Sequence, residues 1–132
     1  MIGLPTVFVV DDDLSVRRSL TRLLRAAGYH AESFAGAADF LARLPCEAPA
    51  CALVDVRMPD VSGFDLLPQL QVACPGLPVI LITGHGDTAM AERALASGAS
   101  NFLVKPVDEP VLLAAVDAAL ASRDRPMALG GG

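Results

Sequence analysis

The stretch TVFVVDDDLSVRRSL (Thr6–Leu20) changes its pattern abruptly at three aspartates. The five residues Thr6–Val10 are all apolar or β-branched, which predicts a short strand that is buried on both faces of a sheet. Apolar residues then recur at helical spacing, which predicts a helix over Leu14–Ala27 with Asp13 as its N-cap. A buried strand, an acidic turn and an amphipathic helix together predict the first unit of an α/β fold.

The alternation of strands and helices continues along the chain. Short, mostly apolar runs predict four further strands, at His30–Phe34, Ala50–Val54, Leu77–Ile82 and Asn101–Val104. Helical periodicity predicts four further helices, at Ala37–Leu44, Ser62–Ala73, Thr88–Ser97 and Glu109–Ala121. This order predicts an α/β fold of the (βα)5 type, with a doubly wound parallel five-stranded sheet and helices on both faces. We expect the flavodoxin-like strand order 2-1-3-4-5, because it places the acidic ends of the first and third strands side by side.

Two segments depart from the regular pattern. The run His30–Phe34 contains Glu32 and Ser33, so we expect this strand at an edge of the sheet. Pro68 falls inside the third predicted helix, where it removes a backbone donor and crowds the preceding turn. We therefore expect that helix to start late or to be kinked.

The composition excludes several classes of protein. The chain has 132 residues, of which 53% are hydrophobic and 19% are charged, so it can form one ordinary domain and is not a disordered tail. A net charge of −5 and an aromatic content of 5% disfavour nucleic-acid binding by this chain itself. The apolar runs are too short to span a membrane, and no signal peptide pattern is found. The three cysteines (Cys46, Cys51 and Cys74) lack CxxC spacing, so we expect thiols in a reducing cytoplasm.

Polar residues follow the carboxyl ends of four predicted strands. Asp11 and Asp12 come after the first strand, Asp55 after the third, Thr83 after the fourth and Lys105 after the fifth. Because parallel strands end at the same edge of a sheet, we expect these side chains to converge. Three carboxylates close together repel one another, and a bound Mg²⁺ ion would relieve that repulsion. An aspartate, a hydroxyl and an ammonium group beside a divalent cation predict phosphoryl transfer, with Asp55 as the acceptor.

Four motifs make the chain resemble the receiver domain of two-component response regulators. They are Val9–Asp13 (VVDDD), Leu53–Pro59 (LVDVRMP), Ile82–Gly84 (ITG) and Lys105–Pro106, which stand in the same order at the ends of four predicted strands. The resemblance extends over residues from about 6 to about 121. The loop sequence ITGHGD further resembles the FixJ-like branch, in which a receiver domain precedes a helix-turn-helix domain.

For the phosphorylation site, the resemblance implies a role for each matching residue. Asp55 accepts a phosphoryl group from a phosphohistidine of a sensor histidine kinase, and Lys105 pairs with one of the phosphoryl oxygens. A Mg²⁺ ion is held by Asp12, Asp55 and the main-chain carbonyl of Arg57, and Asp11 supports it partly through water. The chain is then a phosphoacceptor that assists its own phosphorylation and dephosphorylation, and not an enzyme.

For the switch, the resemblance implies that Thr83 bonds a second phosphoryl oxygen and moves toward it after phosphorylation. Phe102 stands at the position of an aromatic side chain whose rotamer follows Thr83, although ordinary core packing explains a phenylalanine there equally well. Arg57 and His85 are candidates for modulating the access of water to the acyl phosphate, and His85 also fits a solvated loop residue. The peptide bond between Lys105 and Pro106 is expected to be cis.

The resemblance also implies a readout surface, formed by Thr88–Ser97, Asn101–Val104 and Glu109–Ala121. We expect this face to change and to form a homodimer on phosphorylation. Residues 1–122 are expected to form the receiver domain, and residues 123–132 a tail or the start of a linker. That linker would lead to a DNA-binding output domain absent from this chain, through which the protein would control transcription; no membrane contact is expected.

Three other functions fit parts of the pattern. A stand-alone receiver would act through protein contacts alone. A pseudo-receiver would never be phosphorylated, but the presence of Asp12, Asp55, Thr83 and Lys105 together disfavours it. A phosphotransferase of the haloacid-dehalogenase type uses the same residue types and Mg²⁺, but its nucleophile follows the first strand, whereas the nucleophile expected here follows the third.

Overall fold

Five strands and five helices alternate in the computed structural model, which describes residues 4–45 and 49–124. The elements are β1 (Thr6–Val10), α1 (Leu14–Ala26), β2 (His30–Phe34), α2 (Ala37–Arg43), β3 (Ala50–Asp55), α3 (Gly63–Ala73), β4 (Val79–Thr83), α4 (Thr88–Ala96), β5 (Asn101–Val104) and α5 (Glu109–Asp124). The expectations for Cys46 and for the end of the tail lie outside the described residues.

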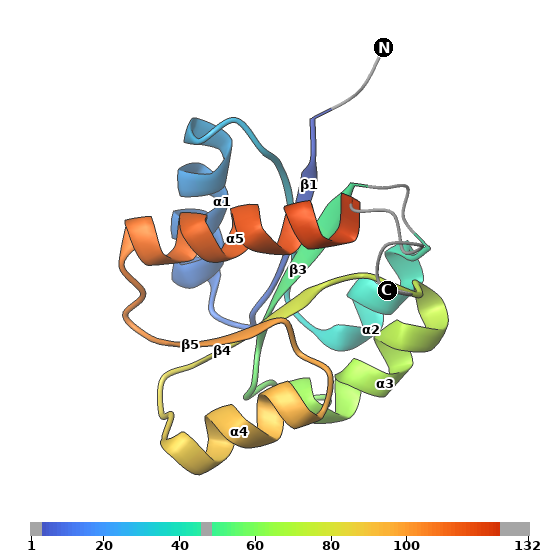
Figure 1. Cartoon of the computed structure of the whole chain (residues 1–132). Helices are drawn as coiled ribbons and strands as arrows, with labels where there is room; N and C mark the ends of the chain where they lie inside the picture. Colours follow the sequence, from blue (N-terminus) through green and yellow to red (C-terminus); the bar gives the residue numbers. More distant parts are fainter. Residues whose placement is uncertain (1–3, 46–48, 125–132) are drawn as a thin grey trace, which may run out of the picture.

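The strands form one parallel sheet in the order β2-β1-β3-β4-β5, which confirms the expected topology (Figure 1). β2 lies at an edge of the sheet, as its polar residues indicated. β1 and β3 are neighbours, and Val10 at the end of β1 is paired with Val54 of β3. This register brings the residues that follow Val10 to the same level of the sheet as Asp55, the last residue of β3.

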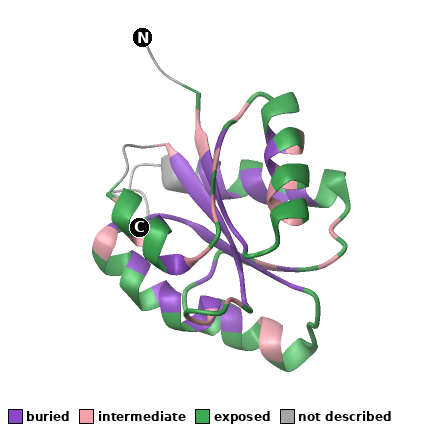
Figure 2. Cartoon of the chain, turned by 180° about the vertical axis from the view of Figure 1, so that it is seen from behind, coloured by how far each residue is buried: buried purple, intermediate pink, exposed green. Residues whose placement is uncertain are grey.

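The two faces of the sheet are covered by different helices, as in other doubly wound folds (Figure 1). Alternate residues of β3 point to the two faces, because side chains alternate along a strand. Ala50, Ala52 and Val54 pack in a cluster with residues of α2, α3 and α4, and Cys51 and Leu53 pack with residues of α1 and α5. Figure 2 shows that the strands form the buried centre of the molecule. A centre that is buried on both faces gives the site at its edge a rigid base.

The structure corrects details of two of the expected helices. α3 runs through Pro68 and begins at Gly63, so the predicted late start is wrong. Pro68 lies on the exposed side of α3. Ala27 was expected to end the first helix, but it lies just beyond α1 and is exposed, whereas Thr21 within the helix is buried. The Thr21 hydroxyl donates to the main-chain carbonyl of Arg17 (2.8 Å), which satisfies its polar group and explains why it is tolerated inside.

None of the helices in the described part of the chain has both the length and the apolar character that a membrane span requires.

Candidate functional site

Three carboxylates meet at the carboxyl edge of the sheet, as the sequence predicted. Asp11, Asp12 and Asp55 each offer an oxygen atom, and these three oxygens lie within 4.8 Å of one another. Asp11 and Asp55 are buried, because they directly follow or end two central strands, whereas Asp12 is exposed. A set of carboxylate oxygens with one solvent-facing member fits a hard divalent cation that keeps part of its water shell, such as Mg²⁺.

Lys105 joins the two buried carboxylates. Its Nζ atom lies 2.8 Å from Oδ2 of Asp11 and 3.4 Å from Oδ2 of Asp55. Burial lowers the pKa of Lys105, but the hydrogen bond that Lys105 donates to Asp11 and the charges of both carboxylates outweigh it, so its pKa is raised and the ammonium form is favoured. The peptide bond between Lys105 and Pro106 is cis, as expected. Lys105, which follows β5, thus places a positive charge beside carboxylates that are distant from it in the sequence.

The electrostatic environment of Asp55 disfavours its charged form. Burial and the neighbouring charge of Asp11 raise its pKa. The main-chain N–H of Arg57, which donates to Oδ1 of Asp55 (3.2 Å), and the ammonium group of Lys105 act in the opposite direction but do not compensate. Lys105 alone therefore does not neutralise the site, and a further cation would be bound favourably.

Ionised Asp55 is expected to destabilise the fold. Because its pKa is higher in the folded than in the unfolded chain, this cost is present above the folded-state pKa and disappears as the pH falls through it. The variant Asp55→Asn is therefore expected to raise the thermal midpoint in Mg²⁺-free buffer at neutral pH by about 2–6 °C. The difference between the two proteins should vanish as the pH is lowered. Calorimetric scans across this pH range test the expectation, and equal midpoints at neutral pH would contradict it.

Thr83 is fully buried, and its hydroxyl is engaged by its own loop. The Oγ1 atom accepts from the main-chain N–H of His85 (3.2 Å) and lies 3.4 Å from the His85 carbonyl oxygen. Among the described residues, the Thr83 hydroxyl makes no hydrogen bond to Asp55 or Lys105. The Thr83 hydroxyl is therefore turned to its own loop. The main chain of Thr83 is tied to Lys105, because its carbonyl accepts from the main-chain N–H of Lys105 (2.7 Å).

The loop after Thr83 packs against the edge strand β5. A Cβ atom at Gly86 would lie 2.6 Å from Cγ2 of Val104 and 2.9 Å from Cε2 of Phe102, so a side chain at Gly86 would force a shift of the loop or of the ring. Phe102 is half-buried and packs against the cluster that includes α3 and α4. Its ring thus lies between the loop and the core, which fits both core packing and a role in the switch.

The other candidate residues are exposed around this edge. The side chain of Arg57 is exposed, and its main-chain N–H bonds Asp55, so the loop that follows β3 is tied to the carboxylate. The expected role of its carbonyl as a metal ligand stays a prediction. His85 is also exposed, and its backbone, not its ring, contacts Thr83. The proposed modulation by these two side chains is compatible with their exposure and stays a prediction.

Two polar contacts of the site were not expected from the sequence. Arg17 on α1 donates from Nη1 to the main-chain carbonyl of Asp11 (2.6 Å). Asp60 accepts from the main-chain N–H of Ala38 (3.2 Å), so the loop after β3 is tied to the start of α2, whose N-cap Gly36 has no side chain to do this. A basic residue close to the N-terminus of a helix opposes the helix dipole, which is a signal that could have pointed to Arg17.

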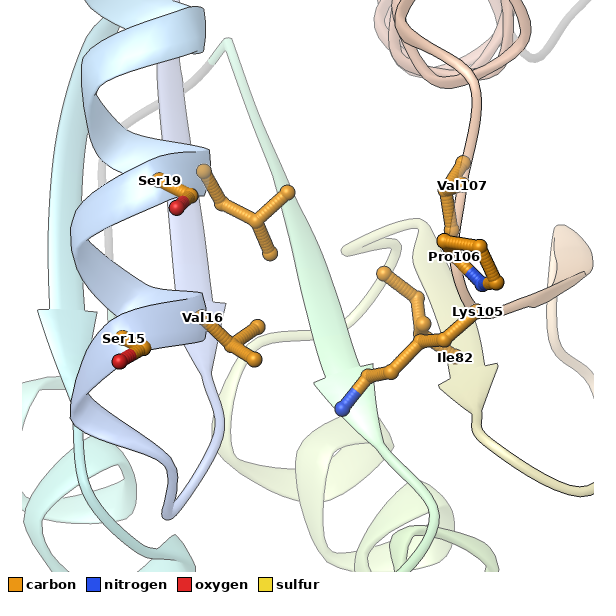
Figure 3. A pocket seen from close by; sticks show the side chains of 8 residues that line it. Ser15, Val16, Ser19, Ile82, Lys105, Pro106 and Val107 are labelled. Atoms are coloured by element: carbon orange, nitrogen blue, oxygen red, sulfur yellow. The ribbon is translucent and has the colours of Figure 1, made fainter.

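A cavity of about 430 Å³ lies beside the acidic site, between α1 and the segment that follows β5 (Figure 3). It is lined by Ser15, Val16, Ser19, Leu20, Ile82, Lys105, Pro106 and Val107. Figure 3 shows the Val16 side chain pointing across the cavity toward Lys105. The cavity was not expected from the sequence, because its wall combines residues of α1 with Ile82 of β4 and with residues that follow β5. A partner seated there would touch Lys105, which itself contacts Asp55.

Comparisons with known proteins agree with this geometry. Residues 7–117 match the family model described as the response regulator receiver domain. The transcriptional regulatory protein FixJ of Azorhizobium caulinodans is 44% identical over 115 residues, which are 86% of this chain and 54% of that protein. The crystal structure of FixJ-N is 38% identical with a TM-score of 0.81, covering 92% of this chain and 96% of the other. The beryllofluoride-activated NtrC4 receiver domain dimer is 30% identical with a TM-score of 0.84, covering 90% and 98%. The chain spans about half the length of the curated relatives it matches.

Proposed function

The chain belongs to the family of response regulator receiver domains of two-component signalling, and from this premise we propose that it is a phosphorylation-dependent switch with Asp55 as the phosphoacceptor. The observation that carries the proposal is the position of Asp55. Its buried carboxylate lies within reach of Asp11, Asp12 and the ammonium group of Lys105, at the edge of the sheet where ligands of such folds bind.

In the proposed reaction, a carboxylate oxygen of Asp55 attacks the phosphorus of a phosphohistidine on a sensor histidine kinase. The new P–O bond forms an acyl phosphate, and the P–N bond breaks with its electron pair left on the imidazole, which then takes up a proton. Lys105, 3.4 Å from Asp55, orients the donor and pairs with a phosphoryl oxygen. Among the residues present, Asp12, Asp55 and the Arg57 carbonyl would hold Mg²⁺, with Asp11 in support, and the bound ion would neutralise negative charge on the donor.

The cavity beside Lys105 supports a docking place for the kinase next to the phosphoacceptor. Its apolar wall, which includes Val16 and Ile82, can contact the surface that presents the histidine. We propose that this exchange takes place in the cytoplasm, where the thiols of Cys51 and Cys74 stay reduced. Both are buried, and burial raises the pKa of the Cys51 thiol to about 12. The chain acts as a phosphoacceptor that assists its own modification, and not as an enzyme that turns over a separate substrate.

A mass measurement tests the phosphoacceptor function. Incubation with acetyl phosphate and Mg²⁺ is expected to add one phosphoryl group, about 80 Da, to the intact protein. The gain should disappear when EDTA removes the divalent cation. Absence of any gain would contradict the proposal and favour a module that acts only through protein contacts. Release of phosphate from a simple phosphomonoester would instead favour a phosphotransferase of the haloacid-dehalogenase type.

The switch itself would start at Thr83. To bond a phosphoryl oxygen, its hydroxyl must leave the main chain of His85, which alters the loop that leads into α4. α4 is loosely held, because Ala94 is its one fully buried side chain. The guanidinium group of the exposed Arg93 of α4 lies 4.0 Å from the centre of the buried Phe64 ring of α3, a contact of about 1 kcal/mol that can be exchanged. Few buried contacts make α4 the element that a modest change in the loop can move.

The readout surface comprises α4, β5 and α5. It carries three large apolar side chains that are about half exposed: Leu95, Val104 and Val111 are 56%, 46% and 50% exposed. Covering these side chains with a partner would remove their apolar area from water, which favours association. The likeness to the activated NtrC4 dimer supports a second copy of this chain as that partner. The modified state needs only a modest preference for the active conformation to move the population.

Dimerisation is expected on addition of beryllofluoride, which mimics the phosphoryl group, and Leu95→Lys is expected to weaken it by about tenfold or more. Sedimentation with and without beryllofluoride provides the measurement. Val72→Lys is the matched control, because Val72 of α3 is 83% exposed but lies outside the readout surface. The proposed interface would be contradicted if beryllofluoride did not change the sedimentation of the unmodified sequence. It would also be contradicted if Leu95→Lys and Val72→Lys weakened the dimer equally.

For the output, we propose control of transcription through a DNA-binding domain outside this chain. Two findings support this proposal. The relative FixJ is named a transcriptional regulatory protein, and this chain matches only about half of its length. The alternative is a stand-alone receiver that acts by protein contacts. The coding sequence after Gly132 distinguishes the two, since a helix-turn-helix domain or a stop codon would follow.

A further inference from the structure

We infer that Arg17 is a positioning residue of the acidic site, whose guanidinium group fixes the turn that carries Asp12. The inference rests on the proposed function, because the carboxylates concerned are those of the phosphorylation site. Arg17 is half-buried in the first turns of α1, and its Nη1 atom lies 2.6 Å from the main-chain oxygen of Asp11. A hydrogen bond of this length from a charged donor is a strong one.

Asp11 is held at every polar group it has. Its main-chain N–H donates to the carbonyl of Phe34 (3.1 Å), and its main-chain oxygen accepts from Arg17. Its side-chain oxygens accept from the main-chain N–H of Asp13 (2.9 Å) and from Nζ of Lys105 (2.8 Å). Strand pairing and the ion pair thus hold Asp11 toward β2 and β5, and Arg17 adds a contact from α1.

Asp12 has no comparable support. Its side chain is exposed, and among the described residues its carboxylate makes no hydrogen bond or ion pair. The direction of Asp12 is therefore set by the main chain on either side of it. The oxygen that Arg17 bonds belongs to the peptide group joining Asp11 to Asp12, so this contact restrains the plane from which the Asp12 side chain projects.

Helix stability does not explain an arginine at this position, because a positive charge near the N-terminus of a helix opposes the helix dipole. A purely electrostatic role of Arg17 and a positioning role predict opposite changes in the binding of a divalent cation. Removing a positive charge beside a cation site would tighten the binding of a divalent cation. Loss of the positioning contact would instead weaken binding, because the Asp12 carboxylate would no longer be held in place.

The experiment compares Arg17→Met, Arg17→Lys and Arg18→Met in the full chain. Arg18 is exposed on the same helix, and among the described residues its side chain makes no hydrogen bond or ion pair, so Arg18→Met removes the same charge without the contact. Titration calorimetry with Mg²⁺ alone is expected to show about tenfold weaker binding for Arg17→Met, a smaller loss for Arg17→Lys and less than about a twofold change for Arg18→Met. Mg²⁺ binding by Arg17→Met that is equal to or tighter than that of Arg18→Met would overturn the inference.

A second measurement requires no metal. The amide of Asp13 is bonded to the Asp11 carboxylate within the same turn, and its hydrogen exchange in Mg²⁺-free buffer should be about threefold faster or more in Arg17→Met than in Arg18→Met. Equal exchange rates would overturn the role of Arg17. If the unmodified sequence binds no Mg²⁺, the proposed function fails, whereas the exchange comparison still decides the role of Arg17. Thermal scans show whether Arg17→Met folds. If it does not, Arg17→Lys takes its place in both measurements.

Discussion

Replacement of Asp55 by asparagine is expected to abolish the gain of about 80 Da from acetyl phosphate. The rate of phosphorylation should fall by more than about 100-fold. The reaction requires a carboxylate oxygen that attacks phosphorus, and an uncharged amide of the same shape is a poor nucleophile. The fold should persist, because the change removes a buried charge whose pKa is already raised by burial and by Asp11. Intact-mass measurements over time provide the test.

The matched control for this variant is Asp60→Asn. Asp60 lies five residues further along the chain, in the loop that follows β3, and is exposed. It accepts from the main-chain N–H of Ala38, a bond that the asparagine oxygen can keep. We expect it to be phosphorylated at the rate of the unmodified sequence. Phosphorylation of Asp55→Asn at the control rate would identify a different acceptor, and the assignment of Asp55 would be wrong.

The second large effect is expected for Asp12→Asn, which should weaken Mg²⁺ binding by about tenfold or more and slow phosphorylation at a fixed Mg²⁺ concentration. Asp12 is the exposed member of the three carboxylates, so it can turn an oxygen to a cation that still carries water. Because its carboxylate has no partner among the described residues, the substitution removes no stabilising contact of the fold.

Asp13→Asn controls for charge alone. Asp13 is the next residue and caps α1 by accepting from the main-chain N–H of Ser15 (2.8 Å), which an asparagine also does well. Its loss of charge equals that of Asp12→Asn, but no role in metal binding is assigned to it. We expect Mg²⁺ binding by Asp13→Asn within about twofold of the unmodified sequence. Equal weakening by the two variants would show that net charge, and not a specific ligand, governs cation binding.

Much of the fold was predictable because the local patterns all point the same way. The strands Thr6–Val10 and Asn101–Val104 begin and end at the predicted residues, and the sheet has the predicted order. Boundaries near proline were less predictable. β4 begins at Val79 and not at Leu77, because Pro78 lacks the N–H that a central strand needs. α3 includes Pro68, because this residue lies on the exposed side of a helix whose opposite side is held by buried apolar contacts.

The membership of the candidate site was also predictable, but its contacts were not. The convergence of Asp11, Asp12, Asp55 and Lys105 follows from their places at the ends of neighbouring parallel strands. The pairing of the Thr83 hydroxyl with the His85 main chain depends on the conformation of one loop, which no spacing in the sequence reveals. The switch role of Phe102 stays a prediction.

The alternation of strands and helices, and the edge of the sheet at which the acidic residues gather, can be derived from residue type and short-range periodicity. The donors that hold the acidic residues depend instead on the packing of distant segments. Lys105 reaches Asp11 across 94 positions in the chain, and Arg17 reaches the Asp11 carbonyl from the adjacent helix. Such contacts depend on how α1, β1 and β5 pack in three dimensions, since burial and side-chain direction are set by the whole core and not by neighbours in the chain.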